Sequence, residues 1–181
     1  LAKPILLLDM GANVGGGAPG NSSFLLDILE AAQRGRFVIC IYDPVSVKQL
    51  SEKSVGDRLC IRMGDSAIER TVSIRNLCDG KFREIEPRHG GQTNFDMGLI
   101  AIVETENGNT VLLTSLRVPP FSLQQLVTFN IIPSDYDLVV AKGVNAPIAA
   151  YAGVCNTIVK LDTPGVTQAD MTRFTYRNRR I

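Results

Sequence analysis

The sequence predicts a single α/β domain with a mixed β-sheet: a β-α-β beginning, antiparallel hairpins in the middle, and helices packed on the sheet. Apolar runs bounded by turn residues alternate with helical spacing in the first third of the chain. Strand-like alternation with glycine turns fills the middle, and helical and apolar segments return in the last third. With 181 residues, 45% of them hydrophobic, the chain can bury one sizeable core.

The first third has the pattern of a β-α-β unit. Residues 4–8 form an apolar run typical of a buried strand, residues 24–33 have helical spacing, and residues 37–42 are again apolar. We expect a parallel pair of strands here. Pro44 suits the first turn of a helix that runs to about residue 50, and residues 58–63 supply another strand.

The middle of the chain is predicted to form antiparallel hairpins. The strand-like segments are residues 70–76, 82–85, 99–104 and 110–116. Asp79-Gly80 indicates a tight turn between the first two, and Asn107-Gly108 one between the last two. Residues 87–95 form a polar loop, and such loops often contain binding sites.

The last third returns to alternating helices and strands. Ser122 is predicted to cap a helix that runs to about residue 129, and residues 146–153 form a second short helix. The strands of this part are residues 138–141 and 157–161. Thr163-Pro164-Gly165 then marks a turn, and Thr167 is expected to cap a last short helix.

Composition argues against two classes of partner. The formal net charge is +1, lysine and arginine are scattered until the last ten residues, and tryptophan is absent, so the sequence does not indicate nucleic-acid binding. The apolar runs stay well below the roughly 20 residues of a membrane span.

The cysteines and the first residues indicate a cellular context. Cys40, Cys60, Cys78 and Cys155 are widely spaced without a C-x-x-C pair, which favours buried thiols in a reducing cytoplasm. The sequence begins without Met and without a signal peptide, directly before a strand. We therefore expect a fragment of a longer protein.

A glycine-rich run at residues 15–23 joins the first strand to the first helix and is a candidate binding loop. Its glycines permit positive φ and close approach of a ligand, and the helix start offers N–H groups to anions or carboxylates. A nucleotide-binding P-loop is disfavoured because Asn21 stands where lysine is needed. The dinucleotide fingerprint is disfavoured because it contains Pro19. Alternatively, the glycines only satisfy loop geometry, and Asn21, Ser22 or Ser23 caps the helix.

Three side chains are candidates for chemistry. Asp9 ends the first strand beside the glycine-rich loop, so it could act on a substrate or support a metal, or merely accept N–H bonds from its own loop. Lys142 follows the strand at 138–141 and could pair with a substrate carboxylate or with Asp9, or be an ordinary solvated lysine. His89 is the only histidine, so no histidine pair for zinc can form.

Residues 9–21, Asp-Met-Gly-Ala-Asn-Val-Gly-Gly-Gly-Ala-Pro-Gly-Asn, resemble the D-x-x-D-N-x-G-G-G-x-x-G-D signature that opens the C-terminal domain of the MlrC-like (microcystinase C, microcystin-degrading) metallopeptidases. Other matching motifs occur in the family's order and extend the resemblance over nearly the whole chain. They are Asp43-Pro44, Val55-Gly56, Gly98, Leu113-Thr114-Ser115 with Arg117, Lys142-Gly143-Val144 and Asp162-Thr163-Pro164-Gly165.

The resemblance implies that residues 1–181 are a C-terminal domain that packs on an absent N-terminal zinc-binding domain. The zinc of the full-length protein would belong to that domain, so no cofactor or metal ligand is expected in this chain. The resemblance also implies a small peptide or amide substrate and a cleft to which Asp9 contributes as a catalytic residue. The expected substrate-binding residues are Asn13, Gly15, Gly16, Gly17, Asn21, His89, Lys142 and Asn145.

Three positions depart from the family's pattern: Ala12 and Asn21 replace acids of the signature, and Asn145 stands where histidine is expected. Such changes would alter specificity or abolish activity if those groups act on the substrate. Two other hypotheses remain open. The chain could be a non-catalytic module that binds an anionic small molecule at the glycine-rich loop, or a structural domain that stabilises or dimerises its neighbour. A homo-oligomer is also possible.

Overall fold

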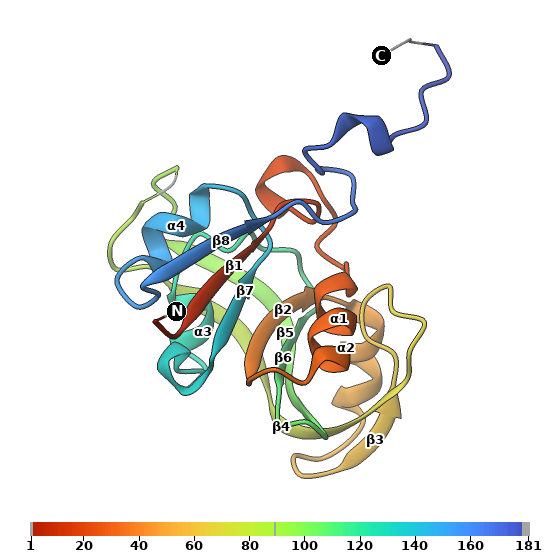
Figure 1. Cartoon of the computed structure of the whole chain (residues 1–181). Coiled ribbons are helices and arrows are strands. Elements are labelled where there is room, and N and C mark those ends of the chain that lie inside the picture. The colour runs from red at the N-terminus through yellow and green to blue at the C-terminus, as the bar shows by residue number, and fades with distance from the viewer. Residues whose placement is uncertain (1, 89, 179–181) are drawn as a thin grey trace.

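The computed structural model describes residues 2–88 and 90–178 and has the predicted mixed α/β architecture (Figure 1). One sheet contains eight strands in the order β3-β4-β5-β6-β2-β7-β1-β8. Strands β8, β1, β7, β2 and β6 run parallel to one another, while β3 to β6 pair antiparallel. The strands are β1 (Ile5–Asp9), β2 (Phe37–Tyr42), β3 (Arg58–Ile61), β4 (Arg70–Arg83), β5 (Asn94–Thr105), β6 (Thr110–Thr114), β7 (Leu138–Ala141) and β8 (Thr157–Leu161).

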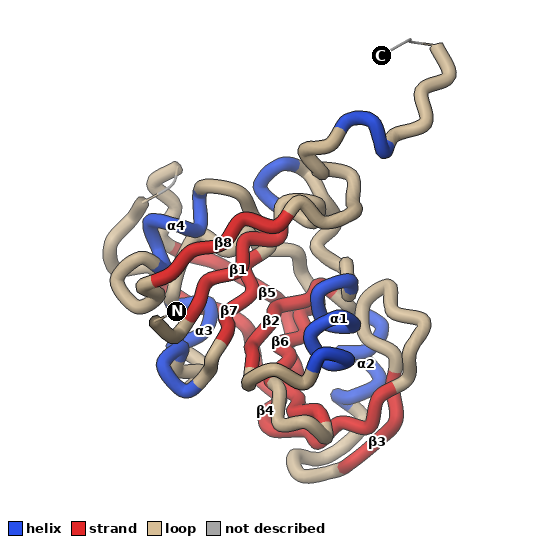
Figure 2. Tube along the Cα trace, viewed as in Figure 1, coloured by secondary structure: helices blue, strands red, loops and turns tan. Residues whose placement is uncertain are grey.

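Helices lie on both faces of this sheet (Figure 2). The α-helices are α1 (Phe24–Ala32), α2 (Pro44–Ser51), α3 (Gln124–Val127) and α4 (Ala146–Tyr151), and the 3-10 helices are η1 (Val14–Gly16), η2 (Pro133–Asp135) and η3 (Met171–Arg173). Helices α1 and α2 lie over one face in Figure 1, and α3 and α4 lie behind the other. In the described part of the chain, every helix lacks the length and apolar composition needed to cross a lipid bilayer.

The core has one layer on each face because successive strand residues point to opposite sides. In β1, Leu6 and Leu8 belong to the cluster that contains Tyr151 of α4. Leu7 between them belongs to the other cluster, together with Leu26 of α1. The near-continuous apolar runs of the parallel strands reflect this two-sided burial.

The β-α-β beginning is confirmed, with one difference in strand order. Strands β1 and β2 are parallel as expected, but they are not neighbours, because β7 lies between them and pairs with both. The helix at Pro44 is also confirmed, and Asp43 caps it by accepting a hydrogen bond from the Ser46 N–H at 2.9 Å.

The predicted turn at Asp79-Gly80 is wrong. Both residues lie inside the long strand β4, at a register irregularity against β5, and the chain reverses only between Arg83 and Asn94. A Cβ on Gly80 would lie 2.6 Å from the Ile100 side chain, so this glycine permits close approach of two strands rather than a turn. The other predicted turn, at Asn107-Gly108, is confirmed by the β5–β6 pairing.

Other boundaries and burial predictions need correction. Helices α3 and α4 are shorter than the predicted residues 122–129 and 146–153. Thr167 does not cap the last helix, since Asp170 accepts the capping hydrogen bond from Thr172. Cys60 is exposed, contrary to the prediction of buried thiols, because it lies in β3 at the edge of the sheet.

Candidate functional site

The carboxyl ends of β1, β7 and β8 bring three polar side chains to one edge of the sheet. Asp9 ends β1, Lys142 follows β7, and Thr163 lies two residues after β8. All three are at least 95% buried, although each is polar. Buried polar groups are stable only when they are paired, so the contacts among these side chains define the centre of the candidate site.

Both carboxylate oxygens of Asp9 have protein partners. Oδ1 accepts hydrogen bonds from the Thr163 hydroxyl and from the Ala12 N–H, the latter at 3.3 Å. Oδ2 lies 3.4 Å from the Lys142 ammonium. The interpretation of Asp9 as an acceptor for its own loop and as the partner of Lys142 is therefore confirmed, and both contacts fix the start of the glycine-rich loop.

Lys142 is a buried cation, so the alternative of an ordinary solvated lysine is wrong. Besides Asp9, its ammonium donates a hydrogen bond to the carbonyl oxygen of Ser22 at 2.5 Å. Burial lowers the pKa of Lys142, and the nearby Asp9 carboxylate opposes that shift. The ammonium thereby connects the end of β7 to the end of β1 and to the residues just before α1.

The glycine-rich loop is exposed at Gly15, Gly16 and Gly17, but three of its N–H groups bond to the two residues just before it. The N–H groups of Gly16 and Ala18 both donate to the Asn13 carbonyl at 3.0 Å, and the Gly17 N–H donates to Val14. Gly17 has a φ of 102°, which a residue with a side chain rarely adopts. These bonds leave fewer free N–H donors for an anion than the sequence pattern suggests.

The start of α1 already has acidic neighbours. The backbone N–H of Ser23 donates to the Asp65 carboxylate at 2.7 Å, and the Ser23 hydroxyl lies within hydrogen-bonding distance of Asp65 and Asp27. Ser23 occupies the N-cap position without a side-chain capping bond, whereas Ser22 accepts from the Phe24 N–H at 3.4 Å. A second anion at this helix end would meet these two carboxylates.

The segment after β8 packs directly on the segment after β1. The Gly11 N–H donates to the Thr163 hydroxyl at 3.0 Å, and the Asn13 N–H donates to the Thr167 hydroxyl at 3.0 Å. A Cβ on Gly11 would collide with the Thr163 carbonyl, so only glycine fits there. The Thr163-Pro164-Gly165 motif therefore packs against the residues that lead into the glycine-rich loop.

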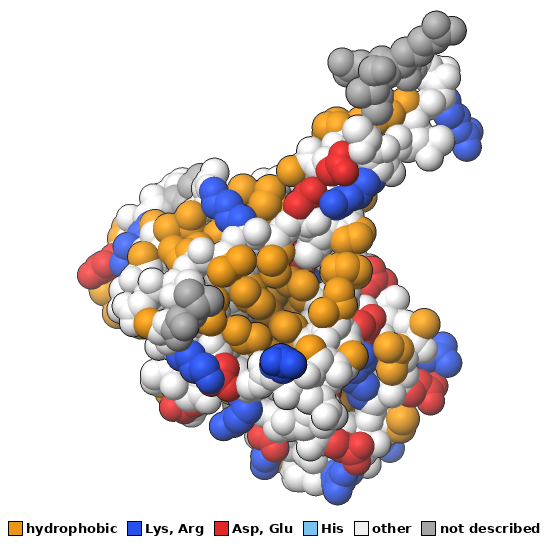
Figure 3. Space-filling view, viewed as in Figure 1, with side chains coloured by type: hydrophobic (Ala, Val, Ile, Leu, Met, Phe, Trp, Pro, Cys, Tyr) orange, Lys and Arg blue, Asp and Glu red, His pale blue; other side chains and the backbone are white. Residues whose placement is uncertain are grey.

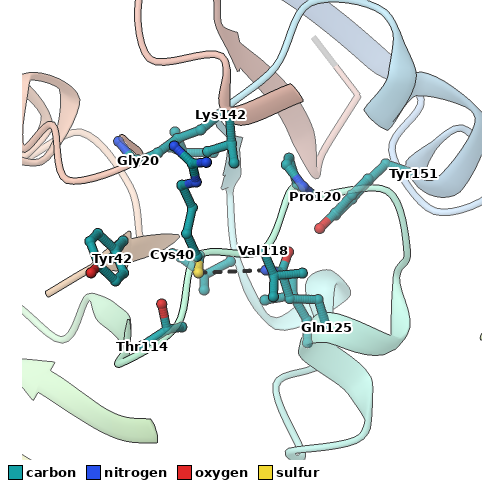
Figure 4. Close-up of a pocket in the computed structure, with 14 residues that line it drawn as sticks. Gly20, Cys40, Tyr42, Thr114, Val118, Pro120, Gln125, Lys142 and Tyr151 are labelled. Atoms are coloured by element: carbon teal, nitrogen blue, oxygen red, sulfur yellow. Dashed lines mark hydrogen bonds between the residues drawn. The ribbon is translucent and has the colours of Figure 1, made fainter. Parts of the chain in front are cut away.

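Beside Lys142 is a small cavity whose polar groups come from different elements (Figure 4). Cys40 comes from β2, Gln125 from α3 and Tyr151 from α4, and the Gln125 amide lies 3.7 Å from the Cys40 sulfur. Burial raises the pKa of the Cys40 thiol to about 12, an effect that Lys142 partly opposes, and burial also raises the pKa of Tyr151. Both groups remain protonated at neutral pH and are poor nucleophiles.

Four of the predicted substrate-binding residues line two shallow pockets. Asn13, Gly15 and Asn145 line one of about 230 Å³. Asn21 lines another of about 130 Å³, together with Asp65 and Ala12. Gly16 and Gly17 are exposed at the loop tip, and His89 lies outside the described residues. The roles assigned to these residues stay predictions.

Sequence reasoning missed a cationic groove beside this edge. A cavity of about 770 Å³ lies between the β4–β5 hairpin and the segment after β6. The residues that line it are Lys81, Phe82, Arg83, Gln92, Asn94, Phe95, Asp96, Arg117, Val118 and Pro119. Lys81 pairs with Asp79, whereas Arg83 and Arg117 form no ion pair with any residue that the structure describes.

Arg117 connects the groove to the glycine-rich loop. Its guanidinium donates to the Ala18 carbonyl at 3.4 Å, and the same side chain lines the small cavity beside Lys142. Arg117 belongs to a motif visible in the sequence, but Arg83 does not, and only the hairpin places both arginines on one groove. Guanidinium groups without acidic partners can bind a carboxylate in a two-pronged geometry.

A metal site is not formed by this part of the chain. Among residues 2–88 and 90–178, no three His, Cys, Asp or Glu side chains gather closely enough to hold a metal ion. The described side chains therefore do not fit the zinc that the family resemblance implies.

Comparison with known proteins now adds an independent finding. The family model described as MlrC C-terminus matches residues 7–178. The chain is similar in structure to a candidate metallopeptidase from Mesorhizobium sp. BNC1, with a TM-score of 0.86 and 24% identity over 98% of this chain. It spans about 37% of that protein's chain, and at this identity the likeness shows a common fold. No curated protein matches the sequence.

Proposed function

Because the chain belongs to the MlrC C-terminus family, we propose that it is the C-terminal, auxiliary domain of a metal-dependent hydrolase that cleaves peptide or amide bonds. In this proposal, the carboxyl edge of the parallel strands and the glycine-rich loop form one wall of the substrate cleft. The ligands of a catalytic zinc ion come from the N-terminal part of the same polypeptide, on which this domain packs.

The observation that carries the proposal is the extent of the match. The family model covers residues 7–178, which is nearly the whole chain, and describes the C-terminus of MlrC proteins. The same fold occurs as about 37% of a larger chain described as a candidate metallopeptidase. A domain of this kind supports a role in which recognition and catalytic metal binding belong to different parts of one polypeptide.

The contacts of Asp9 favour a positioning role for this residue. Its two oxygens are engaged by Thr163, Ala12 and Lys142, and its side chain is 1% exposed. We infer that Asp9 and Lys142 hold the glycine-rich loop in place. A direct catalytic role for Asp9 stays a prediction from the sequence.

Substrate contacts are then assigned to groups that remain accessible. Asn13 and Asn145 line the pocket beside the loop, and their amides can bond to the carbonyl and N–H groups of a peptide. Arg83 and Arg117 line the adjacent groove, where they favour substrates that carry a carboxylate. The half-buried Val118 in the same groove favours an apolar group next to that carboxylate.

The two other hypotheses have less support. An anion-binding module at the glycine-rich loop is disfavoured by the internal hydrogen bonds of Gly16, Gly17 and Ala18 and by the carboxylates at the start of α1. A purely structural domain is favoured by the closed Asp9–Lys142 contact, but that contact does not account for the unpaired arginines of the groove.

Four free cysteines support the expectation of a reducing, cytoplasmic compartment.

The test compares the 181-residue chain with the longer polypeptide that contains it. We expect stoichiometric zinc and chelator-sensitive hydrolysis of peptides only in the longer polypeptide, measured by elemental analysis and chromatography of the products. Calorimetric titration of the 181-residue chain with zinc should show no binding at micromolar concentration. Stoichiometric binding that is lost in Asp9→Ala would instead place a metal site in this domain.

A second measurement tests the groove. In the longer polypeptide, Arg117→Gln should raise the KM for peptides that bear a carboxylate and leave neutral peptides unaffected. Arg34→Gln, at an exposed position outside the groove, is the matched control. Equal effects of Arg117→Gln on charged and neutral peptides would reject carboxylate recognition by the groove.

A further inference from the structure

One half of the sheet has an apolar face over which no described helix lies. Helices α1 and α2 cover the half that contains β2, β5 and β6, whereas β8, β1 and β7 face the viewer openly in Figure 1. The helix α4 lies behind these strands, on their other face. In the parallel half of the sheet, the described helices therefore lie over one face only.

The side chains of this face form rows across the three strands. Ile5 of β1 is in register with Leu138 of β7, and Leu7 is in register with Val140 and Val159. We call the set the open face; it comprises Ile5, Leu138, Val159 and Leu161, which are half-buried, and Leu7 and Val140, which are only 8% and 5% exposed. Figure 3 shows hydrophobic side chains gathered continuously over β1 and β7 in this region. Phe24 and Ile28 of α1 are further exposed hydrophobic residues, 37% and 47% accessible.

Such a face is uncommon in a protein that functions alone. Parallel strands occur almost only where both faces of the sheet are covered. Contiguous apolar patches on a monomer usually mark an interaction surface. In addition, β8 is an edge strand, so its outer backbone groups lack a neighbouring strand in the described part of the chain.

We propose that the open face is the surface on which the preceding part of the same polypeptide docks. The matching family model describes a C-terminus, and this chain spans only 37% of the larger structural relative, so the additional length of such a protein precedes the domain. Strand β1 begins at Ile5, within the open face, so a preceding segment arrives at the margin of that face (Figure 1). This inference rests on the two-part architecture of the proposed function, but not on its chemistry.

The choice of occupant follows from the character of the face. Its side chains are aliphatic, which favours a partner that offers an apolar surface and remains attached permanently. An N-terminal domain of the same polypeptide meets this face at a high effective concentration, so even a modest contact area suffices for stable docking. A second copy of this chain lacks that advantage and becomes an outcome of the test.

A matched pair of variants in β8 tests the proposal in the longer polypeptide. Val159 points to the open face, and its neighbour Ile158, which is 37% exposed, points to the opposite one. We expect Val159→Asp to accelerate limited proteolysis of the junction before residue 1 at least tenfold. Ile158→Asp should leave the cleavage rate unchanged. Equal rates for the two variants would overturn the proposal.

A measurement without substitutions keeps the proposal falsifiable if Val159→Asp does not fold. Hydroxyl-radical footprinting compares side-chain oxidation in the 181-residue chain and in the longer polypeptide. Oxidation of Val159 and Leu161 should fall at least fivefold in the longer polypeptide, while that of Ile158 stays constant. Unchanged oxidation of Val159 and Leu161 would overturn the proposal.

Two further outcomes are decided by the same samples. If the 181-residue chain sediments as a dimer that Val159→Asp dissociates and Ile158→Asp does not, the occupant is a second copy and the proposal is overturned. If the longer polypeptide shows no metal-dependent hydrolysis but its open face is protected, the proposed function fails and the docking surface stands.

Discussion

Replacing Lys142 by methionine tests whether the buried Asp9–Lys142 pair holds the candidate site together. The Lys142 ammonium lies 3.4 Å from the Asp9 carboxylate, and Coulomb's law with an effective dielectric constant of about 20 gives an attraction of about 5 kcal/mol. In the native protein, the cost of removing both charges from water offsets much of this attraction. In Lys142→Met, Asp9 remains buried without its cation.

We therefore expect Lys142→Met to lower the free energy of unfolding by about 3–5 kcal/mol. The Thr163 hydroxyl and the Ala12 N–H still donate to Asp9 in this variant, which favours the lower end of that range. The Ser22 carbonyl, which accepts from the ammonium, loses its donor and adds to the loss.

The assay is urea-induced unfolding at neutral pH, followed by far-UV circular dichroism. Lys160→Met is the matched control, because Lys160 is an exposed lysine of β8 whose ammonium donates to the Asn145 side chain; it should change stability by no more than about 0.5 kcal/mol. The double variant Asp9→Asn, Lys142→Met removes both charges and should recover most of the loss. If Lys142→Met is as stable as the control, the pair does not support the site and the reasoning is refuted.

Three further predictions concern the surroundings of the site and the surface. Gly11→Ala should cost about 1–3 kcal/mol in unfolding free energy, because its methyl group would collide with a backbone carbonyl, whereas Gly153→Ala, with open space around it, should cost much less. Iodoacetamide should label the exposed Cys60 well before Cys40, because burial raises the pKa of the Cys40 thiol to about 12. Peptide mass spectrometry gives the order of labelling, and faster labelling of Cys40 would contradict the packing around it. The Lys3 ammonium and, to a lesser extent, the Arg36 backbone N–H lower the pKa of Asp137 by donating hydrogen bonds to its carboxylate. The stabilising contribution of Asp137 is therefore complete above the ordinary pKa of 3.8, and it is lost as the pH falls through the lower pKa of the folded state. Urea titrations should accordingly show that Asp137→Asn reduces stability at neutral pH and that the difference shrinks in acid.

The strands of the parallel half were predictable because their signal is local. The apolar runs that became β1, β2, β7 and β8 are bounded by proline, glycine and aspartate, and their limits agree with the structure within about two residues. The order of these strands was not predictable, since the position of β7 between β1 and β2 depends on a crossover between distant parts of the chain.

Glycine produced the largest error in the fold. Asp79-Gly80 has the composition of a turn, yet Gly80 lies in the middle of β4, where its missing side chain allows β5 to approach. Glycine serves both in turns and at close contacts between strands, and only the position of the partner strand shows which of the two applies. Cys60 was predicted to be buried for a similar reason: an apolar run indicates a strand but does not tell whether that strand lies at the centre or the edge of a sheet.

The candidate site was predictable in part. Asp9 and Lys142 both end apolar strands, and parallel strands bring such ends to one edge, so their pairing was among the sequence-based alternatives. Thr163, which also contacts Asp9, was not predicted, because nothing local shows that β8 lies beside β1. The groove arginine Arg83 was missed because a single charged residue in a strand has no distinctive pattern.

The contacts at the sheet edge indicate what kind of work this domain can do. Its most deeply buried polar groups, Asp9, Lys142 and Thr163, bond to one another and hold the residues that lead into the glycine-rich loop. The accessible groups are amides and guanidinium groups, which bind a substrate but do not by themselves attack it. A nucleophile paired with a general base is not evident among the described residues that line the site. This arrangement is the one expected of a domain that positions a substrate for chemistry performed by ligands and bases in another part of the polypeptide.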